Sequence, residues 1–438
     1  KTAYEITYGD WSSDVCLPIS LAVIMLFALI TAGAWWIAAC TAKTGTAVRL
    51  SACALSLWVA LPFLGARTQL VTVLGLAVLV WTLDRLRAGA SGIVWWLPVV
   101  FLLWSNLHGG VTAGLFLLVL AIGLSWLVPL ASRVWPLLQR NEGEPPFPPG
   151  ARVPLIAATG LSVAVTFINP YGWRLHREII DSLSDRFMIA TLQEWQSLSF
   201  DTLAGQFFLA YLAGLALLML GWYRRVEPVR WVLLAVFLAL ACRHFRDIPL
   251  FLIVSLPFFA ERIQEAVDWI GRQTFANRLT PSRWAAASTL ALGALLFWLG
   301  ADHVRHVWQS GVDPARFFRG TSYPIEAVEW VQAHRDRVGT KLYNDYGHGG
   351  FLLWWLPGEK IFIDGRMPAW RLGDRRIFED YVQLNSGDPA AVRVLDRYGV
   401  DWALVTQRTP LAEVLEVSPI WREAYADQKV RIYIRQKN

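Results

Sequence analysis

Long apolar runs occupy the first two thirds of the chain and are separated by short polar segments. A helix that crosses a bilayer needs about 17 to 25 mostly apolar residues. Runs that approach this length lie near residues 15–40, 47–65, 68–83, 92–107, 110–131, 153–169, 203–222, 230–243, 247–260 and 284–301. The pattern predicts about ten transmembrane helices, several of them short enough to be tilted or partly re-entrant.

The composition supports a membrane protein and argues against other classes. Hydrophobic residues make up 55% of the 438 positions and 24 residues are tryptophan, which is too apolar for a soluble domain of this length. The four cysteines, Cys16, Cys40, Cys53 and Cys242, have no metal-ligand spacing, so we expect them to pack among apolar side chains. The chain has no HExxH, Walker-type or Rossmann glycine motif, which argues against soluble hydrolase and nucleotide chemistry.

The net charge of +6 reflects membrane topology rather than binding to nucleic acid, which we do not expect as a partner. If the chain starts outside, fourteen basic residues fall in inner loops: Lys43, Arg49, Arg85, Arg87, Arg133, Arg140, Arg152, Arg224, Arg225, Arg230, Arg262, Arg272, Arg278 and Arg283. Seven fall outside: Lys1, Arg67, Arg174, Arg177, Arg186, Arg243 and Arg246. This bias follows the positive-inside rule and predicts an extracytoplasmic C-terminal region.

Three regions are predicted from the changes in composition. The chain starts with Lys1 rather than methionine, so we expect a processed or partial chain from which an earlier span is missing. Residues 1–14 would then be the remnant of the first extracytoplasmic loop, and 15–301 a transmembrane helical bundle. Residues 302–438 have an ordinary composition with helical and strand periodicity, which predicts a small extracytoplasmic α/β domain.

The predicted outer ends of the helices hold the unusual polar motifs, which are Arg67, "SNLHGG", "NPYGWRLHREI", "EWQ" and "RHFRD". In the segment near 173–188, apolar residues recur every four positions between charged ones. This spacing predicts an amphipathic helix on the outer membrane surface, or equally a helix that packs against the C-terminal domain.

Within the C-terminal region, "KLYND", "KIFID", "DWALVT" and "VRIYIRQ" are predicted strands, and "YPIEAVEWVQAHRD", "FLLWW" and "AAVRVLDRYG" predicted helices. Asp345 and Asp364 would follow two of the strands, at the edge where sites in open α/β sheets form, with His348 and Arg366 nearby. The alternative is that Asp364 and Arg366 pair with each other or fasten the domain to the membrane part. We expect the "HGG" copies at 108–110 and 348–350 to meet where the domain joins the bundle.

Taken together, "WSNLHGG", "NPYG", "EWQS", "RHFRDIPLF" and "YGHGGFLLWWLP" followed by "KIFIDGR" resemble, over nearly the whole chain, a family of bacterial polytopic proteins. That family is grouped with glycosyltransferases of the GT-C fold. The resemblance implies a bacterial inner-membrane protein that takes a sugar from a polyprenyl-phosphate carrier on the extracytoplasmic face and moves it to an envelope acceptor. It also implies an acidic residue in the first outer loop that acts as the base or binds a divalent metal. Glu5, Asp10 and Asp14 are the available positions, although they form no DxD motif.

For such a site, arginines at outer helix ends would bind phosphate bidentately, which selects Arg67, Arg243 and Arg246. Asn106, His108 and His244 would donate hydrogen bonds, and Glu194 with Trp195 would bind a sugar. The structural alternatives are snorkelling or paired arginines, histidines satisfied at helix ends, and a tryptophan of the interfacial belt.

Three functions remain open at this point. The first is a membrane transferase whose partners are a membrane lipid and a polyprenyl-phosphate-linked sugar. The second is a non-catalytic scaffold or anchor subunit that keeps the architecture and binds other membrane subunits. A transporter is the third, but the chain shows no inverted repeat and few charges within the apolar runs.

Overall fold

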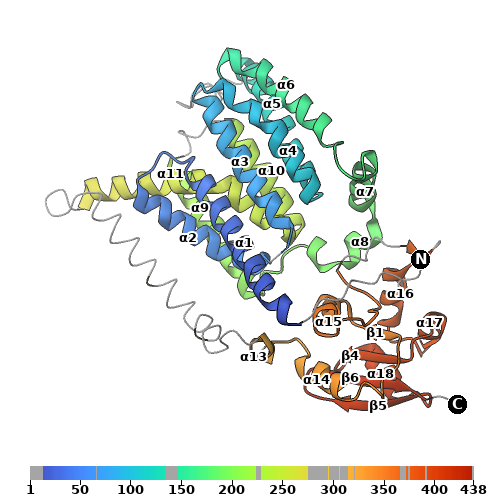
Figure 1. Cartoon of the computed structure of the whole chain (residues 1–438). Helices are drawn as coiled ribbons and strands as arrows, with labels where there is room; N and C mark the ends of the chain where they lie inside the picture. Colours follow the sequence, from blue (N-terminus) through green and yellow to red (C-terminus); the bar gives the residue numbers. More distant parts are fainter. Residues whose placement is uncertain are drawn as a thin grey trace. The chain divides into compact units, whose positions relative to one another are not determined.

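The computed structural model describes residues 13–65, 67–134, 147–222, 228–274, 294, 305, 314–319, 321–365, 371–372, 375–389 and 392–436. The chain forms two compact units (Figure 1). One unit is Leu21–Leu299, which is helical, and the other is Gly300–Asn438 together with Lys1–Ser20. We call them the helical unit and the C-terminal unit.

The helical unit contains long apolar helices that alternate in direction. Its helices are α1 (Ser13–Ala39, which starts in the other unit), α2 (Thr46–Ala60), α3 (Gln69–Arg87), α4 (Leu97–Leu107), α5 (Val111–Val134), α6 (Arg152–Val165), α7 (Trp173–Ser184), α8 (Arg186–Thr191), α9 (Leu203–Trp222), α10 (Pro228–Arg243) and α11 (Ile248–Thr274). Short 3₁₀ turns join them, among them η1 (Leu61–Phe63), η2 (Ser91–Trp96), η5 (Gln193–Trp195) and η7 (Phe245–Asp247). Nine of the ten predicted runs are helical, and the run near 284–301 lies outside the described residues apart from Ala294.

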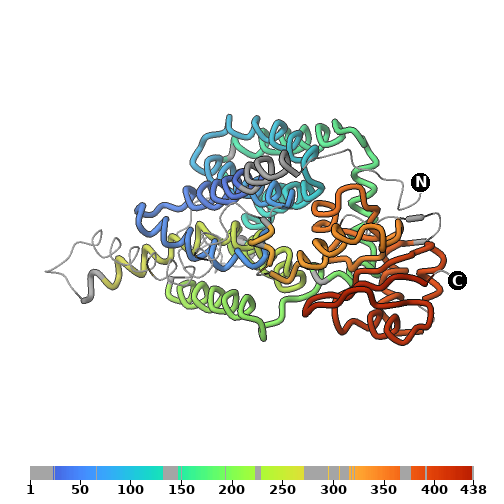
Figure 2. The backbone as a smooth tube through the Cα atoms, turned by 60° about the horizontal axis from the view of Figure 1, so that its bottom comes forward, coloured from blue at the N-terminus to red at the C-terminus, as the bar shows by residue number. Residues whose placement is uncertain are grey.

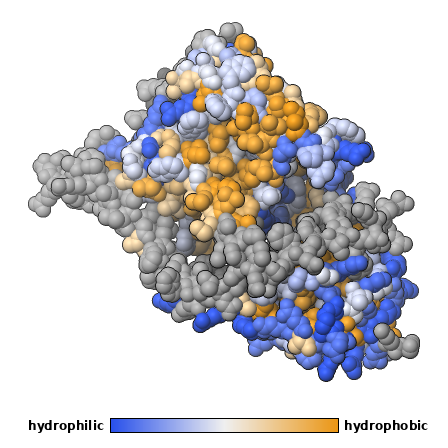
Figure 3. Space-filling view, in the orientation of Figure 1, coloured by the Kyte–Doolittle hydropathy of each residue, from blue (hydrophilic) through white to orange (hydrophobic). Residues whose placement is uncertain are grey.

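Four helical segments of the described chain are long and apolar enough to cross a membrane: Thr46–Phe63, Gln69–Arg87, Val111–Ala131 and Leu203–Gly221. Met25–Ala39, Ser91–Leu107 and Arg152–Val165 are apolar but shorter. Apolar side chains occupy much of the face of this unit that Figure 3 shows. Among the exposed large apolar side chains of the unit are Leu217 and Leu220, which are 70% and 74% exposed. Patches of this kind are rare on soluble monomers, so the helices indicate membrane association.

Helix α11 is the central helix of the unit, since it packs against α2, α3, α9 and α10. Its first half, up to Ala260, is buried on nearly every side. Its second half is polar and ion-paired: Glu261 accepts from Arg230 at 3.2 Å, and Arg262, only 4% exposed, lies 2.9 Å from Glu265. This network closes the end of the helical unit at which α10 begins.

The C-terminal unit is built on a four-stranded mixed sheet in the order β1-β4-β6-β5 (Figure 1). The backbone of this unit is orange to red in Figure 2. The strands are β1 (Leu342–Asn344), β4 (Trp402–Thr406), β5 (Trp421–Ala426) and β6 (Val430–Arg435), and a short pair β2 (Arg371–Leu372) and β3 (Arg375–Arg376) lies apart from them. Strands β1 and β4 are parallel, while β4–β6 and β5–β6 are antiparallel. The helices are α13 (Pro314–Arg319), α14 (Ile325–Ala333), α15 (Gly349–Trp355), α16 (Ile377–Leu384), α17 (Val392–Tyr398) and α18 (Pro410–Glu416).

Most of the predicted elements of this unit are confirmed, but the predicted strand "KIFID" is wrong. Residues 360–364 are irregular, with a bend at Phe362, and none of them belongs to a strand. The buried side chain of Asn344 replaces the missing strand, because its Oδ1 accepts from the amide of Phe362 at 2.8 Å and its Nδ2 donates to the carbonyl of Ile363 at 2.8 Å. The apolar alternation of this segment therefore reflects burial rather than strand pairing.

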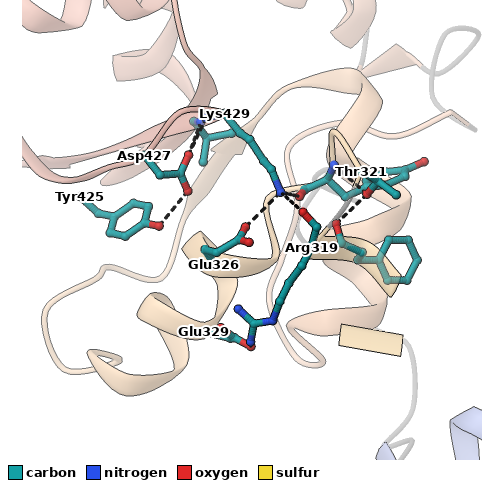
Figure 4. Close-up of polar contacts among 10 residues, drawn as sticks. Arg319, Thr321, Glu326, Glu329, Tyr425, Asp427 and Lys429 are labelled. Atoms are coloured by element: carbon teal, nitrogen blue, oxygen red, sulfur yellow. Dashed lines mark hydrogen bonds and ion pairs between the residues drawn. The ribbon is translucent and has the colours of Figure 1, made fainter. Parts of the chain in front are cut away.

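A lysine fastens the β5–β6 hairpin to the segment before α14 (Figure 4). Lys429 Nζ donates to the carbonyls of Arg319 and Tyr323 at 3.2 and 3.1 Å and to Glu326 at 3.1 Å. Asp427 closes the hairpin turn by accepting from the amide of Lys429 at 2.7 Å. The edge of the sheet is thus tied to the first helices of the unit by one side chain with three acceptors.

Candidate functional site

The loops at one end of the helical unit gather the polar residues that the sequence predicts. Because successive helices alternate in direction, the segments 61–68, 108–110, 166–202 and 244–247 share this end. The contacts that join them are the ion pair Arg67–Glu194, Gln69 Nε2 to Arg246 O at 3.2 Å, Asn106 Nδ2 to Ile168 O at 2.8 Å and Ser197 Oγ to Arg243 O at 3.3 Å. We call Arg67, Gln69, Thr72, His108, Glu194, Trp195, Arg243, His244, Arg246 and Asp247 the helix-end cluster.

Trp104 anchors this end by filling a slot between three helices. The indole is 2% exposed and lies against Gly75 of α3 and Gly114 of α5. A Cβ atom at Gly75 would approach the ring to 2.4 Å, and one at Gly114 to 2.6 Å, so both positions need glycine. The indole Nε1 also donates to Thr72 Oγ1 at 3.1 Å. The tryptophan of "WSNLHGG" therefore has a packing role.

His108 continues the same hydrogen-bond chain at the end of α4. Its Nδ1 accepts from the amide of Gly110 at 3.1 Å and lies 2.7 Å from Thr72 Oγ1. Because an amide can only donate, Nδ1 is the unprotonated nitrogen, and the ring proton is on Nε2. A Cβ at Gly110 would meet Thr72 Oγ1 at 2.2 Å, so this glycine is also required. One nitrogen of His108 is structural, and the other remains a donor.

Burial, followed by the positive charge of Arg246, lowers the pKa of His108 from 6.5 to about 4. The folded protein therefore holds His108 neutral, whereas the unfolded chain binds a proton below about pH 6.5. The stabilisation that comes from holding His108 neutral is complete at pH values above the unfolded-state pKa. It is lost as the pH falls toward the folded-state pKa. We expect acidification from pH 7 to pH 5 to cost about 2 kcal/mol of unfolding free energy through this residue.

His108→Asn tests this pH dependence, because asparagine keeps an acceptor near the Nδ1 position but does not titrate. Thermal unfolding of both proteins in one detergent, followed by tryptophan fluorescence at pH 7 and pH 5, gives the difference. The wild type should lose more stability on acidification than the variant. Equal losses in the two proteins would mean that His108 is protonated in the folded state at pH 5.

A cation and two aromatic rings form the next layer of the cluster. The guanidinium carbon of Arg246 lies 4.4 Å from the centroid of the Trp195 ring. The ring of His244 meets Trp195 edge-on, with centroids 5.3 Å apart, and its Nδ1 lies 3.3 Å from Asp247 Oδ2. Burial raises the pKa of Asp247, although His244 and Arg246 oppose the shift. One face of Trp195, expected to stack on a sugar, is thus occupied by Arg246.

The remaining charges of the cluster are more open to solvent. Arg67 pairs with Glu194, and the two side chains are 67% and 39% exposed, so the ion pair adds little stability. Arg243 is exposed, and no side chain of the described residues forms a hydrogen bond or ion pair with its guanidinium group. The cluster contains three guanidinium groups and two carboxylates, those of Glu194 and Asp247, and His108 is neutral. The cluster therefore carries excess positive charge.

Sequence reasoning missed several members of this end. Gln69 and Thr72, in the first turn of α3, were not predicted. Asp247 was expected as a partner of Arg246, and its side chain lies 3.3 Å from Nδ1 of His244. The signal for the tryptophan slot was the pair Gly75 and Gly114, glycines inside apolar helical runs where a neighbouring side chain can approach the backbone closely. Asn106 donates to the carbonyls of Leu102 and Ile168, which satisfies its amide nitrogen within the fold.

The C-terminal unit holds a second polar group, at the carboxyl end of β1. Asp345 is 7% exposed, and its Oδ2 accepts from the amide and the hydroxyl of Thr406, the last residue of β4, both at 2.6 Å. Its Oδ1 is buried and has no hydrogen-bond partner among the residues that the structure describes, and the same holds for Nδ1 of His348. Burial lowers the pKa of His348, while the charge of Asp345 raises it.

Asp364 reaches the same edge by close packing rather than from a strand end. It is 2% exposed, and a Cβ atom at Gly349 would lie 2.7 Å from the Cβ of Asp364 and 2.2 Å from the carbonyl oxygen of Ile363. Arg366, the expected partner of Asp364, lies outside the described residues. The helical unit and the C-terminal unit are described separately, so the expected meeting of the two "HGG" copies stays a prediction.

Of the expected catalytic acids, Glu5 and Asp10 lie outside the described residues, and Asp14 belongs to the first turn of α1. Across the described ranges, no group of three or more His, Cys, Asp or Glu residues is placed to hold a metal ion. A cavity of about 360 Å³ between α5 and α10 has an apolar lining that includes Leu124, Val128 and Trp231. It lies at the opposite end of these helices from the cluster and offers no polar chemistry.

Comparison with known proteins adds no assignment. No protein-family profile matches the chain, and no curated protein matches it. The function must therefore be argued from the two polar groups themselves.

Proposed function

We propose that the helix-end cluster binds the phosphate of a polyprenyl-phosphate-linked sugar, and that the chain is a membrane transferase that moves this sugar to an envelope acceptor. The observation that carries the proposal is the gathering of Arg67, Arg243 and Arg246 at one end of apolar helices. Guanidinium groups bind phosphate oxygens through paired, charge-assisted hydrogen bonds. Arginines close to hydrocarbon are costly unless they bind an anion or reach water.

Two features favour a lipid phosphate over a soluble one. The apolar outer surface of the helices is continuous with the cluster end, where α7 exposes Trp173, Ile180 and Leu183 between charged residues. Such a helix lies in the interface of a bilayer, at the depth of lipid head groups. Nε2 of His108, which carries a proton at neutral pH, would supply a neutral hydrogen bond beside the arginines.

The binding step is tested by the lipid that the purified full-length chain retains. We expect extraction and mass spectrometry to find a polyprenyl phosphate with the wild type. Arg67→Ala and Arg246→Ala should each reduce retention about tenfold, the effect of losing one charge-assisted contact. Binding of added polyprenyl phosphate in detergent can be measured by the quenching of tryptophan fluorescence. The wild type should bind it about ten times more tightly than Arg67→Ala or Arg246→Ala.

Arg174→Ala is the matched control. Arg174 is exposed on α7, and its replacement removes the same charge from the same end of the unit. Its retention should equal that of the wild type. Full retention by the Arg67→Ala/Arg246→Ala double variant would refute the cluster as the phosphate site. An equal loss in the Arg174 control would indicate general charge attraction instead.

A scaffold or anchor subunit is the second candidate function. It is favoured by the structural roles of Trp104, Asn106 and His108 Nδ1, which all serve packing or helix-end hydrogen bonds. Under this proposal, the chain would purify with other membrane subunits and retain no specific lipid. The topological part of the proposal, a bacterial inner membrane with the C-terminal unit outside, rests on the distribution of arginines in the sequence.

A further inference from the structure

The carboxyl edge of β1 contains two buried polar atoms that lack partners and stand on one turn. Asp345 precedes the 3₁₀ turn η8 (Tyr346–His348), and the amide of His348 donates to the carbonyl of Asp345 at 3.0 Å. Side chains three residues apart eclipse each other on such a turn. Within the described ranges, neither Oδ1 of Asp345 nor Nδ1 of His348 has a hydrogen-bond partner.

Leaving both atoms unpaired is unfavourable, since each buried polar group without a hydrogen bond costs about 1 to 3 kcal/mol. Rotation of the imidazole can remove both costs at once, by directing an Nδ1–H group at Oδ1. The carboxylate cannot turn to meet it, because the amide and hydroxyl of Thr406 hold its other oxygen. The imidazole is thus the mobile partner and the carboxylate the fixed one.

We propose that Asp345 and His348 form a carboxylate–imidazole dyad that presents Nε2 of His348 as a proton acceptor to the hydroxyl group of a bound ligand. His348 is half-buried, and its Nε2 is not among the buried atoms without partners, which leaves Nε2 as the nitrogen for a ligand. A carboxylate that accepts from Nδ1–H fixes this tautomer and makes Nε2 the basic nitrogen. A ligand alcohol, such as a sugar hydroxyl, then donates its proton along the O–H···Nε2 hydrogen bond.

The location fits a binding site. The carboxyl ends of the parallel strands β1 and β4 meet at this edge, where ligands commonly bind in α/β sheets. Gly349, the next residue after His348, brings the backbone of the turn close to Ile363 and Asp364. The dyad lies wholly within the C-terminal unit and does not depend on phosphate binding by the helix-end cluster, so the two proposals can fail separately.

The tautomer of His348 is the direct test. Full-length protein labelled with ¹⁵N in the histidine rings is compared with His348→Gln, which identifies the His348 signals. The nitrogen shifts at neutral pH should show a protonated Nδ1 and an unprotonated Nε2. A His348 that carries its proton on Nε2 would overturn the proposal.

Carbethoxylation by diethyl pyrocarbonate, followed residue by residue by mass spectrometry, gives a second readout. The reagent attacks an unprotonated imidazole nitrogen, so Asp345→Asn should slow the reaction at His348 about fivefold by removing the charge-assisted hydrogen bond. His334 provides an internal reference, because its Nδ1 meets the neutral carbonyl of Trp330 at 2.9 Å rather than a carboxylate. Its rate should not change.

Thr406→Val controls for a purely structural effect of Asp345. This variant removes the hydroxyl donor to Oδ2 but leaves the carboxylate and its charge in place. It should keep the Nδ1–H tautomer and a His348 rate close to that of the wild type. If Asp345→Asn leaves the rate unchanged, or if Thr406→Val slows it as much, Asp345 only supports the fold and the dyad is excluded.

Discussion

Replacing Trp104 by alanine is expected to lower the free energy of unfolding of the helical unit by about 3 to 5 kcal/mol, the range for truncating a fully buried aromatic side chain. The indole fills a slot whose walls are the backbones of α3 and α5 at Gly75 and Gly114. The two glycine walls have no side chains that could fill the space. The cavity therefore stays open, which places the cost in the upper part of the range.

The loss of stability should extend to the helix-end cluster. Trp104 Nε1 donates to the hydroxyl of Thr72, and this hydroxyl lies 2.7 Å from Nδ1 of His108. Thermal unfolding in detergent measures the effect, with Trp96→Ala as the matched control. Trp96 precedes α4 on the same chain segment but is 66% exposed. A Trp104→Ala protein as stable as the Trp96→Ala protein would mean that the slot is not formed.

The second large effect is expected for Asn344→Leu in the C-terminal unit. Asn344 is fully buried, and its amide donates to the carbonyls of Asp345 and Ile363 at 2.9 and 2.8 Å while accepting from the amide of Phe362. Leucine has a similar volume but leaves the amide of Phe362 and the carbonyl of Ile363 unsatisfied, whereas the carbonyl of Asp345 keeps the amide of His348 as a donor. At about 1 to 3 kcal/mol for each such group, we expect a loss of about 3 to 5 kcal/mol, enough to unfold many domains.

Hydrogen exchange of the full-length protein measures this loss in the amides of β1 and β4. The matched control is Asn385→Leu, which makes the same change of side chain at a half-buried position. Asn385 follows the last residue of α16, and its Nδ2 donates a hydrogen bond to Tyr343 Oη at 2.9 Å. Protection of β1 and β4 should fall far more in the Asn344 variant. Similar exchange in both variants would show that residues 361–364 are held without the Asn344 bridge.

The sequence predicted the helices of the membrane part well because their signal is local. A run of apolar residues long enough to form a helix at the membrane needs no knowledge of its neighbours, and nine of the ten runs are helical. The number of spans is a different matter. The buried first half of α11 shows that an apolar run can be enclosed by other helices rather than face lipid.

In the C-terminal unit, the same local reasoning succeeded for β1, β4 and β6, but it missed α13, α16, α18, β2 and β3 and failed at two further places. The segment 360–364 has a strand pattern but pairs with a side chain, and β5 was not predicted at all. Only Trp421 of strand β5 is buried, and its exposed and half-buried residues do not alternate, so the sequence shows no strand periodicity. Strand β5 forms its ladder hydrogen bonds with β6. The two strands come into register only because Asp427 closes the hairpin turn between them.

By itself, the sequence determined the apolar helices, their alternating direction and the polar residue types at their ends. These properties depend on composition and periodicity over a few turns. Only the tertiary structure decided that Arg67 pairs with Glu194, that Arg246 covers Trp195, and that Asp345 and His348 both keep an unpaired atom. Such contacts join residues that are distant along the chain or depend on side-chain rotation, and hydrophobic periodicity carries no information about either.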